Sequence, residues 1–433
     1  MNFPPVFAGK RFAVLGLGKA GLPAATALRD MGAEVFVWDD SAASREAAAD
    51  FTVMLPSEIP GNLEALVLSP GIPHKLPKAH PQALWAAGHS VPILTDAELL
   101  YRAVRLSGSA ARFAGITGTN GKSTTTALLA HMLTLAGIPN AAGANLGPAA
   151  LALKLLPDHG VYVLEMSSYM LERLATLRFD VAAMLNLSPD HLDRHRDMAG
   201  YAAAKREIFA RQDAACTAVI GVDDPLSRDM ADWLDRQKAQ VVRISGENFI
   251  TGPARALPGT HNAQNAAAAS ALARALGVGE DKIALGIETF PGLAHRQQEV
   301  ALRDGVRFIN DSKATNADAT ARAMACYERF VWIAGGVAKA GGITDLAPYF
   351  PRVNKAFLIG QDGAAFAKTL ETQDVLLEVV GTLEEAVPRA FEQAKASGTE
   401  IVLFSPAAAS FDQFPNFEVR GETFAALAQG GSK

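Results

Sequence analysis

The feature that most constrains the fold of this chain is the regular alternation of short apolar, β-branched runs with alanine-rich helical stretches. Such alternation is typical of parallel α/β layers, in which a helix follows each strand. We therefore predict an α/β protein with three sets of strands. They are expected at 11–16, 34–40 and 65–71, at 112–118, 161–167, 181–188 and 216–224, and at 306–311, 330–336, 355–360 and 400–406.

A chain of 433 residues, of which 49% are hydrophobic and 20% charged, can bury several cores. At roughly 100–200 residues per domain, this length suggests two to four domains. Proline and glycine punctuate the pattern near Pro92–Asp96 and near Gly292–Gln298, and a new strand or helix pattern follows each stretch. These signals predict three domains, at 1–95, 96–297 and 298–433.

Composition excludes several classes of protein. The net charge is -5, with a pI near 6.0, so no broad basic surface for nucleic acid is expected. Cys216 and Cys326 are the only cysteines, which excludes a disulfide framework and favours a reducing compartment. The N-terminus lacks a signal-peptide pattern, and no apolar run approaches ~18 residues. We expect a soluble cytoplasmic protein without a membrane partner.

A glycine-rich loop follows the predicted strand at 112–118 and leads into a helical pattern. It departs from the usual phosphate-loop spacing, because Ile116 stands where the first glycine should be. Glycines let backbone N–H groups approach phosphate oxygens, and the helix N-terminus adds partial positive charge. A phosphate-binding loop in a P-loop-type central sheet is therefore predicted, made of Gly118, Thr119, Asn120, Gly121, Lys122, Ser123 and Thr124.

A second glycine loop follows the first predicted strand, and Asp39 and Asp40 come about 20 residues later. This pattern fits the dinucleotide fingerprint of a Rossmann-like sheet. The backbone amides of such a loop suit any diphosphate, so a dinucleotide, another nucleotide such as a UDP-sugar, and an empty scaffold all stay open. The loop consists of Gly16, Leu17, Gly18, Lys19, Ala20 and Gly21.

Polar side chains also gather where predicted strands of the second set end. Glu165 ends the strand at 161–165, on the sheet edge that faces the ligand crevice, where it suits Mg²⁺. A metal-linked or catalytic cluster is predicted just past the next strand, at Asp190, His191, Asp193 and His195. Lys205 lies on a predicted helix and, taken alone, reads as a surface lysine.

A series of segments resembles the Mur ligases in sequence and in order along nearly the whole chain. The segments are GITGTNGKST, VLEMSSYMLE, NLSPDHLDRH, AAAKREIF, GTHNAQNAAAA, GLAHR, INDSKATN, AGGVAK and LFSPAAASFDQFPNFEVRGETF. The last four are most similar to the branch of this family that adds D-glutamate to UDP-N-acetylmuramoyl-L-alanine. The resemblance implies a cytoplasmic, monomeric, ATP-dependent amide ligase of peptidoglycan precursor synthesis, a step required for cell shape and division.

The resemblance also implies how the three domains share the work. The first would bind the UDP substrate, the central one ATP, and the Rossmann-like third one glutamate. The substrate carboxylate would become an acyl phosphate before the amine attacks. Transfer of phosphate between anions needs charge neutralisation, so two Mg²⁺ ions are expected.

The resemblance assigns the following residues to the ATP and metal sites. Lys122, His191 and Lys205 would be catalytic, and Lys205 would carry a carbamate that makes it an oxygen ligand. The expected metal ligands are Ser123, Glu165, His191 and Lys205. Besides the loop at 118–124, ATP would contact Asn265, which His261 and Asn262 flank, and also Arg296 and Asp311.

Two more groups of residues are implied for the other substrates. UDP-N-acetylmuramoyl-L-alanine would contact the loop at 16–21 and Asp39, Ser69, Gly71 and Asn145. Glutamate would contact Lys313, Thr315, Lys339, Ser410 and Phe417, where two cations suit a dicarboxylate. The sequence departs from the family pattern by an insertion after Lys339 and by an acidic stretch, 37–44, with no evident basic partner.

Three other functions fit parts of this sequence. A folylpolyglutamate-type synthetase, or a ligase that adds L-glutamate, would keep the same motifs, since residue types do not reveal stereochemistry. A nicotinamide-dependent oxidoreductase would use the loop at 16–21 but would leave the second loop and Glu165 unexplained. A non-catalytic nucleotide-binding scaffold would not need polar residues clustered at strand ends, because such clusters reduce stability unless they are used.

Overall fold

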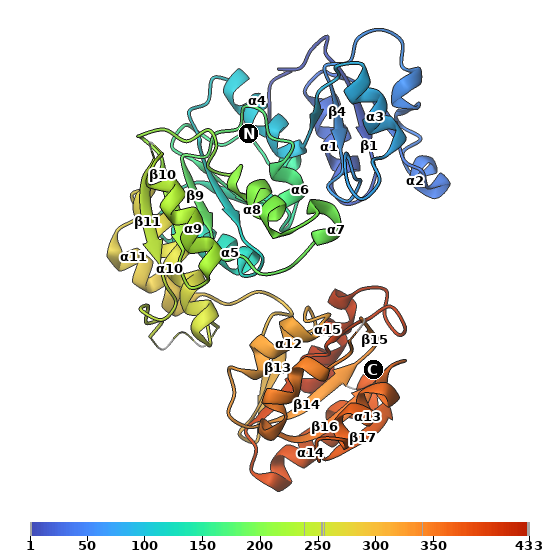
Figure 1. Ribbon diagram of the computed structural model, residues 1–433, viewed down its shortest axis with the longest axis vertical. Helices are drawn as coiled ribbons and strands as arrows, with labels where there is room; N and C mark the ends of the chain where they lie inside the picture. The colour runs from blue at the N-terminus through green and yellow to red at the C-terminus, as the bar shows by residue number, and fades with distance from the viewer. Residues whose placement is uncertain (1, 238, 253, 255, 340, 431–433) are drawn as a thin grey trace. The chain divides into compact units, whose positions relative to one another are not determined.

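The computed structural model of the chain describes residues 2–237, 239–252, 254, 256–339 and 341–430. It divides into two compact units (Figure 1). Unit 1 comprises 1–253 and 262–290, and unit 2 comprises 254–261 and 291–433. Unit 1 holds two sheets and unit 2 holds the third, so the three predicted sets of strands are confirmed as separate sheets.

The first sheet has five parallel strands in the order β3-β2-β1-β4-β5. The strand order reverses between β1 and β4, which opens a crevice at their carboxyl ends. The strands are β1 (Arg11–Leu15), β2 (Glu34–Trp38), β3 (Thr52–Val53), β4 (Ala65–Leu68) and β5 (Ile93–Leu94). The helices are α1 (Gly21–Asp30), α2 (Ala42–Glu46), η1 (Pro56–Glu58) and α3 (Pro81–Gly88).

The central sheet has six parallel strands in the order β11-β10-β9-β6-β8-β7. They are β6 (Arg112–Thr117), β7 (Asn140–Ala144), β8 (Val161–Glu165), β9 (Val181–Met184), β10 (Thr217–Gly221) and β11 (Gln240–Ile244). The helices are α4 (Asp96–Leu106), α5 (Lys122–Leu135), η2 (Ala150–Ala152), α6 (Ser168–Leu171), α7 (Leu192–His195), α8 (Met198–Arg206), α9 (Pro225–Leu234), α10 (Thr260–Ala275) and α11 (Glu280–Thr289).

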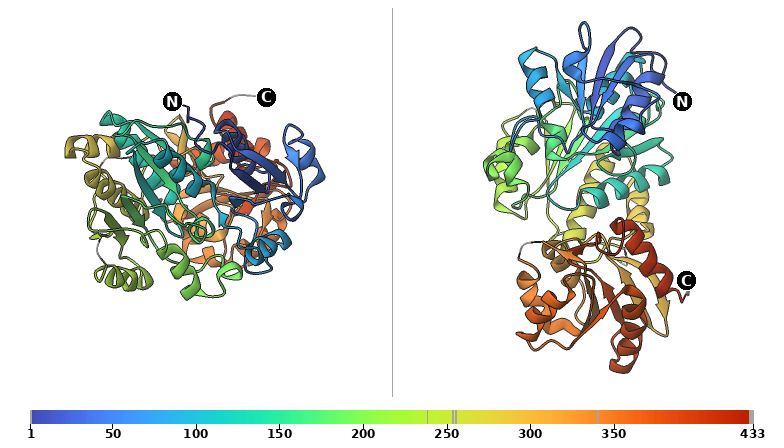
Figure 2. Two further views of the ribbon diagram at one scale, coloured as in Figure 1. Left: turned by 90° about the horizontal axis from the view of Figure 1, so that it is seen from above. Right: turned by 90° about the vertical axis from the view of Figure 1, so that its right-hand side faces the viewer.

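The first and central sheets share one continuous hydrophobic core within unit 1, which runs from Phe12 through Leu100 to Phe113. Helix α4 joins the two sheets, and its buried Glu98 accepts hydrogen bonds from the amides of residues 175–177 and from the Thr176 hydroxyl. Figure 1 and Figure 2 show the first sheet, in blue, beside the central sheet, in cyan to green. The three-domain division at residues 95 and 297 stays a prediction.

Unit 2 is built on a six-stranded sheet in the order β12-β13-β18-β14-β16-β17, in which only β12 is antiparallel to its neighbour among the described strands. These strands are β12 (Gln298–Arg303), β13 (Val306–Asn310), β14 (Phe330–Gly335), β16 (Val353–Ile359), β17 (Leu377–Gly381) and β18 (Ile401–Phe404). A two-stranded sheet pairs β15 (Val337–Ala338) with β19 (Ala408–Ala409).

Alternate residues of β14 explain why helices cover both faces of this sheet. Trp332 belongs to one buried cluster, whereas Val331 and Ile333 belong to another on the opposite face. The helices are α12 (Ala317–Met324), η3 (Thr344–Arg352), α13 (Gly363–Glu371), α14 (Leu383–Ser397) and α15 (Phe417–Ala428). Met324, Phe350 and Phe366 pack in the first cluster, and Phe391 and Phe424 in the second, so α14 and α15 share one face.

Candidate active site

The phosphate loop lies between β6 and α5, as the sequence predicts, but the helix begins inside the motif. Helix α5 starts at Lys122, so Ser123 and Thr124 lie in its first turn. Gly121 precedes the helix with a φ of 84°, a left-handed conformation that glycine adopts without strain. A Cβ atom at Gly121 would also lie 2.0 Å from Oδ1 of Asn265. The residue predicted to lie against adenine is therefore packed on the loop itself.

Two lysines converge on one carbonyl of this loop. Lys122 donates from Nζ to the carbonyl oxygens of Gly118, at 2.9 Å, and Thr119, at 2.8 Å. Lys205, on α8, donates from Nζ to the same Gly118 oxygen at 2.8 Å, and its Nζ lies 3.4 Å from the Thr117 hydroxyl. Residue types and spacing do not reveal this contact, because the two lysines are 83 positions apart, whereas the family resemblance assigns both to one site.

Lys205 is the most unusual ionisable group of the site, with a side chain only 1% exposed. Burial, and then the charge of Lys122, lower the pKa of Lys205 well below its usual value, against the opposing charges of Asp190 and Glu165. Its Nζ also lies 4.6 Å from the ring centroid of Tyr201. Taken alone, Lys205 reads as a surface lysine from sequence, and that reading is wrong.

Glu165 ends β8 and is buried, as expected of a residue that faces the crevice. Oε1 accepts a 2.5 Å hydrogen bond from Nδ2 of Asn145, and the Asn145 backbone amide donates to the Glu165 carbonyl. Oε2 is buried and has no hydrogen-bond partner among the described residues. A buried carboxylate oxygen without a partner is costly, so it is suited to a cation.

The predicted cluster at 190–195 divides into two parts. His191 is half-exposed, has a φ of 53°, and pairs with Asp190, whose Oδ2 lies 3.3 Å from Nε2. Burial lowers the pKa of His191, although Asp190 opposes this shift. His195 instead turns into the interior, where Nε2 lies 2.8 Å from the Ser168 hydroxyl and Nδ1 lies 3.4 Å from Glu172.

Metal ligands of the usual kind do not form a cage on their own. Among the described residues, no three His, Cys, Asp or Glu side chains are grouped so that they could hold a metal ion. The predicted set would need the Ser123 hydroxyl and a carbamate on Lys205 in addition to Glu165 and His191. The free oxygen of Glu165 and the buried amine of Lys205 fit such a set.

The glycine loop of the first sheet lines a cavity of about 580 Å³ at the carboxyl ends of β1 and β4. The predicted residues among its lining are Gly16, Gly18, Lys19, Ala20, Asp39, Ser69 and Gly71. Leu17 and Gly21 are buried and do not belong to the lining. Gly21 packs so tightly that a Cβ atom there would lie 1.7 Å from the carbonyl oxygen of Gly16.

The carboxylate of Asp39 accepts hydrogen bonds from nearby backbone amides. Its carboxylate accepts the Leu17 amide at 2.7 Å and the Ser41 amide at 2.9 Å. The acidic stretch also has basic contacts that the sequence does not reveal. Arg45 donates to the carbonyls of Asp39 and Asp40, and Nε2 of His80 lies 3.1 Å from Asp40 Oδ2.

In unit 2 the carboxyl group of Asp311 is buried just after β13. Ser405 Oγ donates to Oδ2 at 2.7 Å, and the Gln297 amide donates to Oδ1 at 3.2 Å. Burial raises the pKa of Asp311 to about 7, although these hydrogen bonds and the charge of Arg296 oppose the shift. Arg296 lies in the turn that precedes β12, and its amide donates to the Leu293 carbonyl.

The residues predicted for glutamate also lie in unit 2. Nζ of Lys313 lies 3.8 Å from the ring centroid of Phe417, at the start of α15, and the Thr315 amide donates to the Lys313 carbonyl. Lys339 directly follows β15, and Ser410 directly follows its partner strand β19.

One residue missed from sequence is Arg420, which is 1% exposed. It donates to both the hydroxyl and the carbonyl of Ser312, beside Lys313, and to the carbonyl of Ala408 in β19. Its position in the C-terminal motif could have drawn attention to it.

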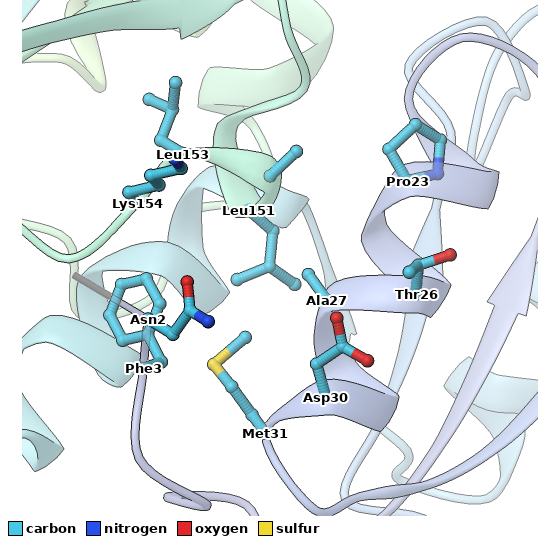
Figure 3. A pocket seen from close by; sticks show the side chains of 11 residues that line it. Asn2, Phe3, Pro23, Thr26, Ala27, Asp30, Met31, Leu151, Leu153 and Lys154 are labelled. Atoms are coloured by element: carbon cyan, nitrogen blue, oxygen red, sulfur yellow. The ribbon is translucent and has the colours of Figure 1, made fainter.

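A further cavity of about 600 Å³ contains none of the predicted site residues. Thr26 and Asp30 of α1 face it on one side, and Leu151 and Lys154 on the other (Figure 3). Within the described ranges, no helix is long and apolar enough to cross a membrane.

Comparisons with known proteins identify the family of the chain. The Mur ligase middle domain matches residues 116–256, and the Mur ligase glutamate ligase domain matches residues 295–408. The chain is 46% identical to the UDP-N-acetylmuramoylalanine--D-glutamate ligase of Paramagnetospirillum magneticum, over 98% of this chain and 97% of that one. It is 47% identical to the enzyme of the same name from Caulobacter vibrioides, over 98% and 96%.

Among solved structures, the chain resembles the UDP-N-acetylmuramate-alanine ligase MurC of Thermotoga maritima. The TM-score is 0.58 at 17% identity, with 97% of this chain and 99% of that one covered, so this likeness concerns the fold alone. The two domain matches and the full-length relatives together lead to one conclusion: the chain belongs to the Mur ligase family.

Proposed function

We propose that this chain joins D-glutamate to the carboxyl group of UDP-N-acetylmuramoyl-L-alanine at the expense of ATP, in peptidoglycan precursor synthesis. The observation that carries the proposal is the 46–47% identity, over nearly the whole length, to ligases named for this substrate and for D-glutamate. The substrate carboxylate attacks the γ-phosphorus of ATP and releases ADP. The glutamate nitrogen then attacks the acyl phosphate carbon, loses a proton and expels phosphate.

The phosphate loop supports the first step. In our proposal Lys122 exchanges its contacts with the Gly118 and Thr119 carbonyls for phosphate oxygens, while the amides of residues 119–123 and the start of α5 bind the β-phosphate. Asn265, which is packed on Gly121, would contact the adenine from the side of α10.

Glu165 and Lys205 would hold Mg²⁺ together with Ser123 and His191. When bound, the metal supplies positive charge that neutralises the phosphate oxygens. The lowered pKa of Lys205 supports its modification, because a neutral amine is the form that reacts with CO₂. In that reaction an N–C bond forms, one C–O bonding pair becomes a carboxylate lone pair, and Nζ releases a proton.

The cavity of the first sheet would bind the UDP part of the substrate. Its volume of about 580 Å³ lies within the range of small-molecule sites. Asp39, which lines this cavity, accepts from the Leu17 and Ser41 amides and so holds the glycine loop in place.

The decisive experiment measures phosphate release with UDP-N-acetylmuramoyl-L-alanine, ATP and Mg²⁺, with either D- or L-glutamate. We expect turnover with the D-isomer only, and no reduction of a nicotinamide cofactor. Turnover with L-glutamate alone, or with a folate in place of the UDP substrate, would favour the alternative ligases.

Two variants test the central residues. Lys122→Ala should abolish turnover yet leave binding of the UDP substrate largely intact, and normal turnover would remove the loop from the mechanism. Lys205→Ala should be inactive and partly rescued by short carboxylates. The matched control is Lys19→Ala, a lysine of the other cavity, which should not respond to carboxylates.

Carbamylation of Lys205 has a direct readout besides activity. Protein equilibrated with ¹³C-bicarbonate should show a carbamate resonance that disappears in Lys205→Ala. Lys122→Met should weaken the resonance, because it removes both the charge that lowers the pKa of Lys205 and the cation beside the carbamate. A resonance that persists in Lys205→Ala would assign the modification to another lysine.

A further inference from the structure

The loop at residues 68–74 forms one wall of the first-sheet cavity. It follows β4 and contributes Ser69, Pro70, Gly71, Ile72 and Pro73 to the lining. Its two prolines have no N–H group, so the loop can make few hydrogen bonds within itself. Backbone carbonyls buried in such a loop need donors from elsewhere.

Arg173 supplies these donors from the central part of unit 1. It lies two residues after α6, which follows Glu165, and it is only 3% exposed. Nη1 donates to the carbonyls of Leu68, at 2.9 Å, and Ser69, at 3.1 Å, and Nη2 donates to that of Ile72 at 2.7 Å. Nε lies 3.3 Å from Nδ1 of His74, so all three guanidinium nitrogens are used on this loop.

A second arginine completes the pattern. Arg194 donates to the carbonyl of Gly71 at 3.2 Å, and its guanidinium carbon lies 4.2 Å from the ring centroid of Tyr169. Carbonyls 68, 69, 71 and 72 therefore all accept from arginines of the central part. A single side chain can donate to several carbonyls at once only if it has several donors in a fixed geometry. The planar guanidinium of arginine has this geometry, and lysine lacks it.

The burial of Arg173 is costly for the fold. Burial, and then the charge of Arg194, lower the pKa of Arg173 to about 10, although Glu172 opposes this. Among the described residues, the hydrogen bonds of its guanidinium go to three carbonyls and one imidazole. Desolvation of a buried charge that has only neutral acceptors offsets much of the stability that its hydrogen bonds contribute. Stability alone therefore does not explain this arrangement.

We propose that Arg173 is a positioning residue that fixes the loop at 68–74 in the shape that binds the nucleotide-sugar substrate. Its hydrogen bonds hold this wall of the cavity against the segment that follows Glu165. This inference rests on the proposed function, since it assigns the UDP substrate to the first-sheet cavity. Arg173 acts through the loop and not on the reacting atoms.

The test compares Arg173→Ala with wild type in the ligation assay. The variant should raise KM for UDP-N-acetylmuramoyl-L-alanine at least about tenfold, the change expected when charged hydrogen bonds that order the loop are lost. KM for ATP and kcat should stay close to wild type. Arg173→Lys should behave like Arg173→Ala, because it keeps the charge but not the geometry.

Chemical rescue separates positioning from general stability. Millimolar guanidinium should enter the space left in Arg173→Ala and lower KM for the UDP substrate towards wild type. The matched control is Arg243→Ala, which removes an exposed arginine paired with Asp232 and Asp235 and should change neither KM nor the response to guanidinium. If Arg173→Ala does not fold, Arg194→Ala serves instead and should raise the same KM by a smaller factor.

The outcomes are distinct. Wild type that does not turn over the UDP substrate would refute the proposed function, and this inference would fail with it. Active wild type with an unchanged KM in Arg173→Ala would refute the inference alone. Equal rises in KM for ATP and for the UDP substrate, or rescue by the lysine variant, would also reject the positioning role.

Discussion

Replacing Asp311 with asparagine should make the stability of unit 2 less dependent on pH. The carboxyl group is buried after β13, and burial raises its pKa from 3.8 to about 7. In the folded chain it is therefore protonated at mildly acidic pH, whereas in the unfolded chain it is ionised. Asparagine has nearly the same shape and remains neutral at every pH, and it can still accept from the Gln297 amide.

The size of the effect follows from linkage between protonation and folding. Because the pKa is raised in the folded state, this group contributes its stability at low pH and loses it as pH rises from about 4 to about 7. A gap of about three pKa units corresponds to about 4 kcal/mol over the whole window. Between pH 5 and pH 8 the free energy of unfolding should fall by about 2–3 kcal/mol more in wild type than in Asp311→Asn.

Trp332 offers a local probe for this measurement. Its Nε1 donates to the carbonyl of Ser405, the residue whose hydroxyl donates to Asp311. Urea unfolding would be followed by Trp332 fluorescence in a background where the other three tryptophans, Trp38, Trp85 and Trp233, are phenylalanine. This background reports on unit 2 alone, because the other three lie in unit 1.

A matched control is Asp304→Asn, which alters an exposed carboxylate paired with Lys395 in the same unit. Its difference from wild type should stay nearly constant between pH 5 and pH 8. If the difference between wild type and Asp311→Asn is equally constant, the carboxyl group is not held neutral by burial and the reasoning is refuted.

Three further substitutions have expected outcomes. Gly121→Ala should weaken binding of a fluorescent ATP analogue at least about tenfold, because its φ of 84° alone costs about 1–2 kcal/mol and its Cβ would lie 2.0 Å from Asn265 Oδ1; unchanged affinity would contradict this. Gly21→Ala should lower both the melting temperature and UDP-substrate affinity, since its Cβ would lie 1.7 Å from the Gly16 carbonyl oxygen. Glu98→Gln should destabilise unit 1 by about 1.5–3 kcal/mol at pH 7 in urea unfolding. Burial raises the pKa of Glu98, but its hydrogen bonds outweigh this and lower it below 4.5, so the loss should shrink as pH falls below that value.

Every strand predicted from sequence is present, but β11, β12 and β17 were missed although each contains β-branched residues. All three lie at sheet edges and have few buried positions, so their apolar pattern is weak. Strands β3 and β5 were missed because two residues make no pattern. Strand β7, Asn140–Ala144, was missed because it contains no β-branched residue. It becomes a strand through pairing with β8 along its whole length, so the neighbour decides the conformation and local propensity does not.

In the candidate site, too, local features could be predicted from sequence and contacts between distant segments could not. Residues that end or directly follow strands, such as Glu165 and Ser69, could be placed from sequence, because the carboxyl ends of parallel strands share one edge. Contacts between segments that are far apart in the sequence could not be predicted in this way. Arg173 meets a loop about 100 positions earlier, and each partner alone looks ordinary, a polar residue after a short helix and a proline-rich turn.

The pair of lysines at Gly118 shows how such a distant contact changes a local assignment. Two ammonium groups that donate to one carbonyl at 2.8–2.9 Å repel each other, and the pKa of Lys205, the more buried of the two, falls. A carbamate on Lys205 would reverse the sign of its charge and turn repulsion of Lys122 into attraction. Binding of a phosphate by Lys122 would in turn withdraw it from that carbonyl. With both changes, the loop would link the charge state of Lys205 to the ligand of Lys122 through a contact between residues far apart in the sequence.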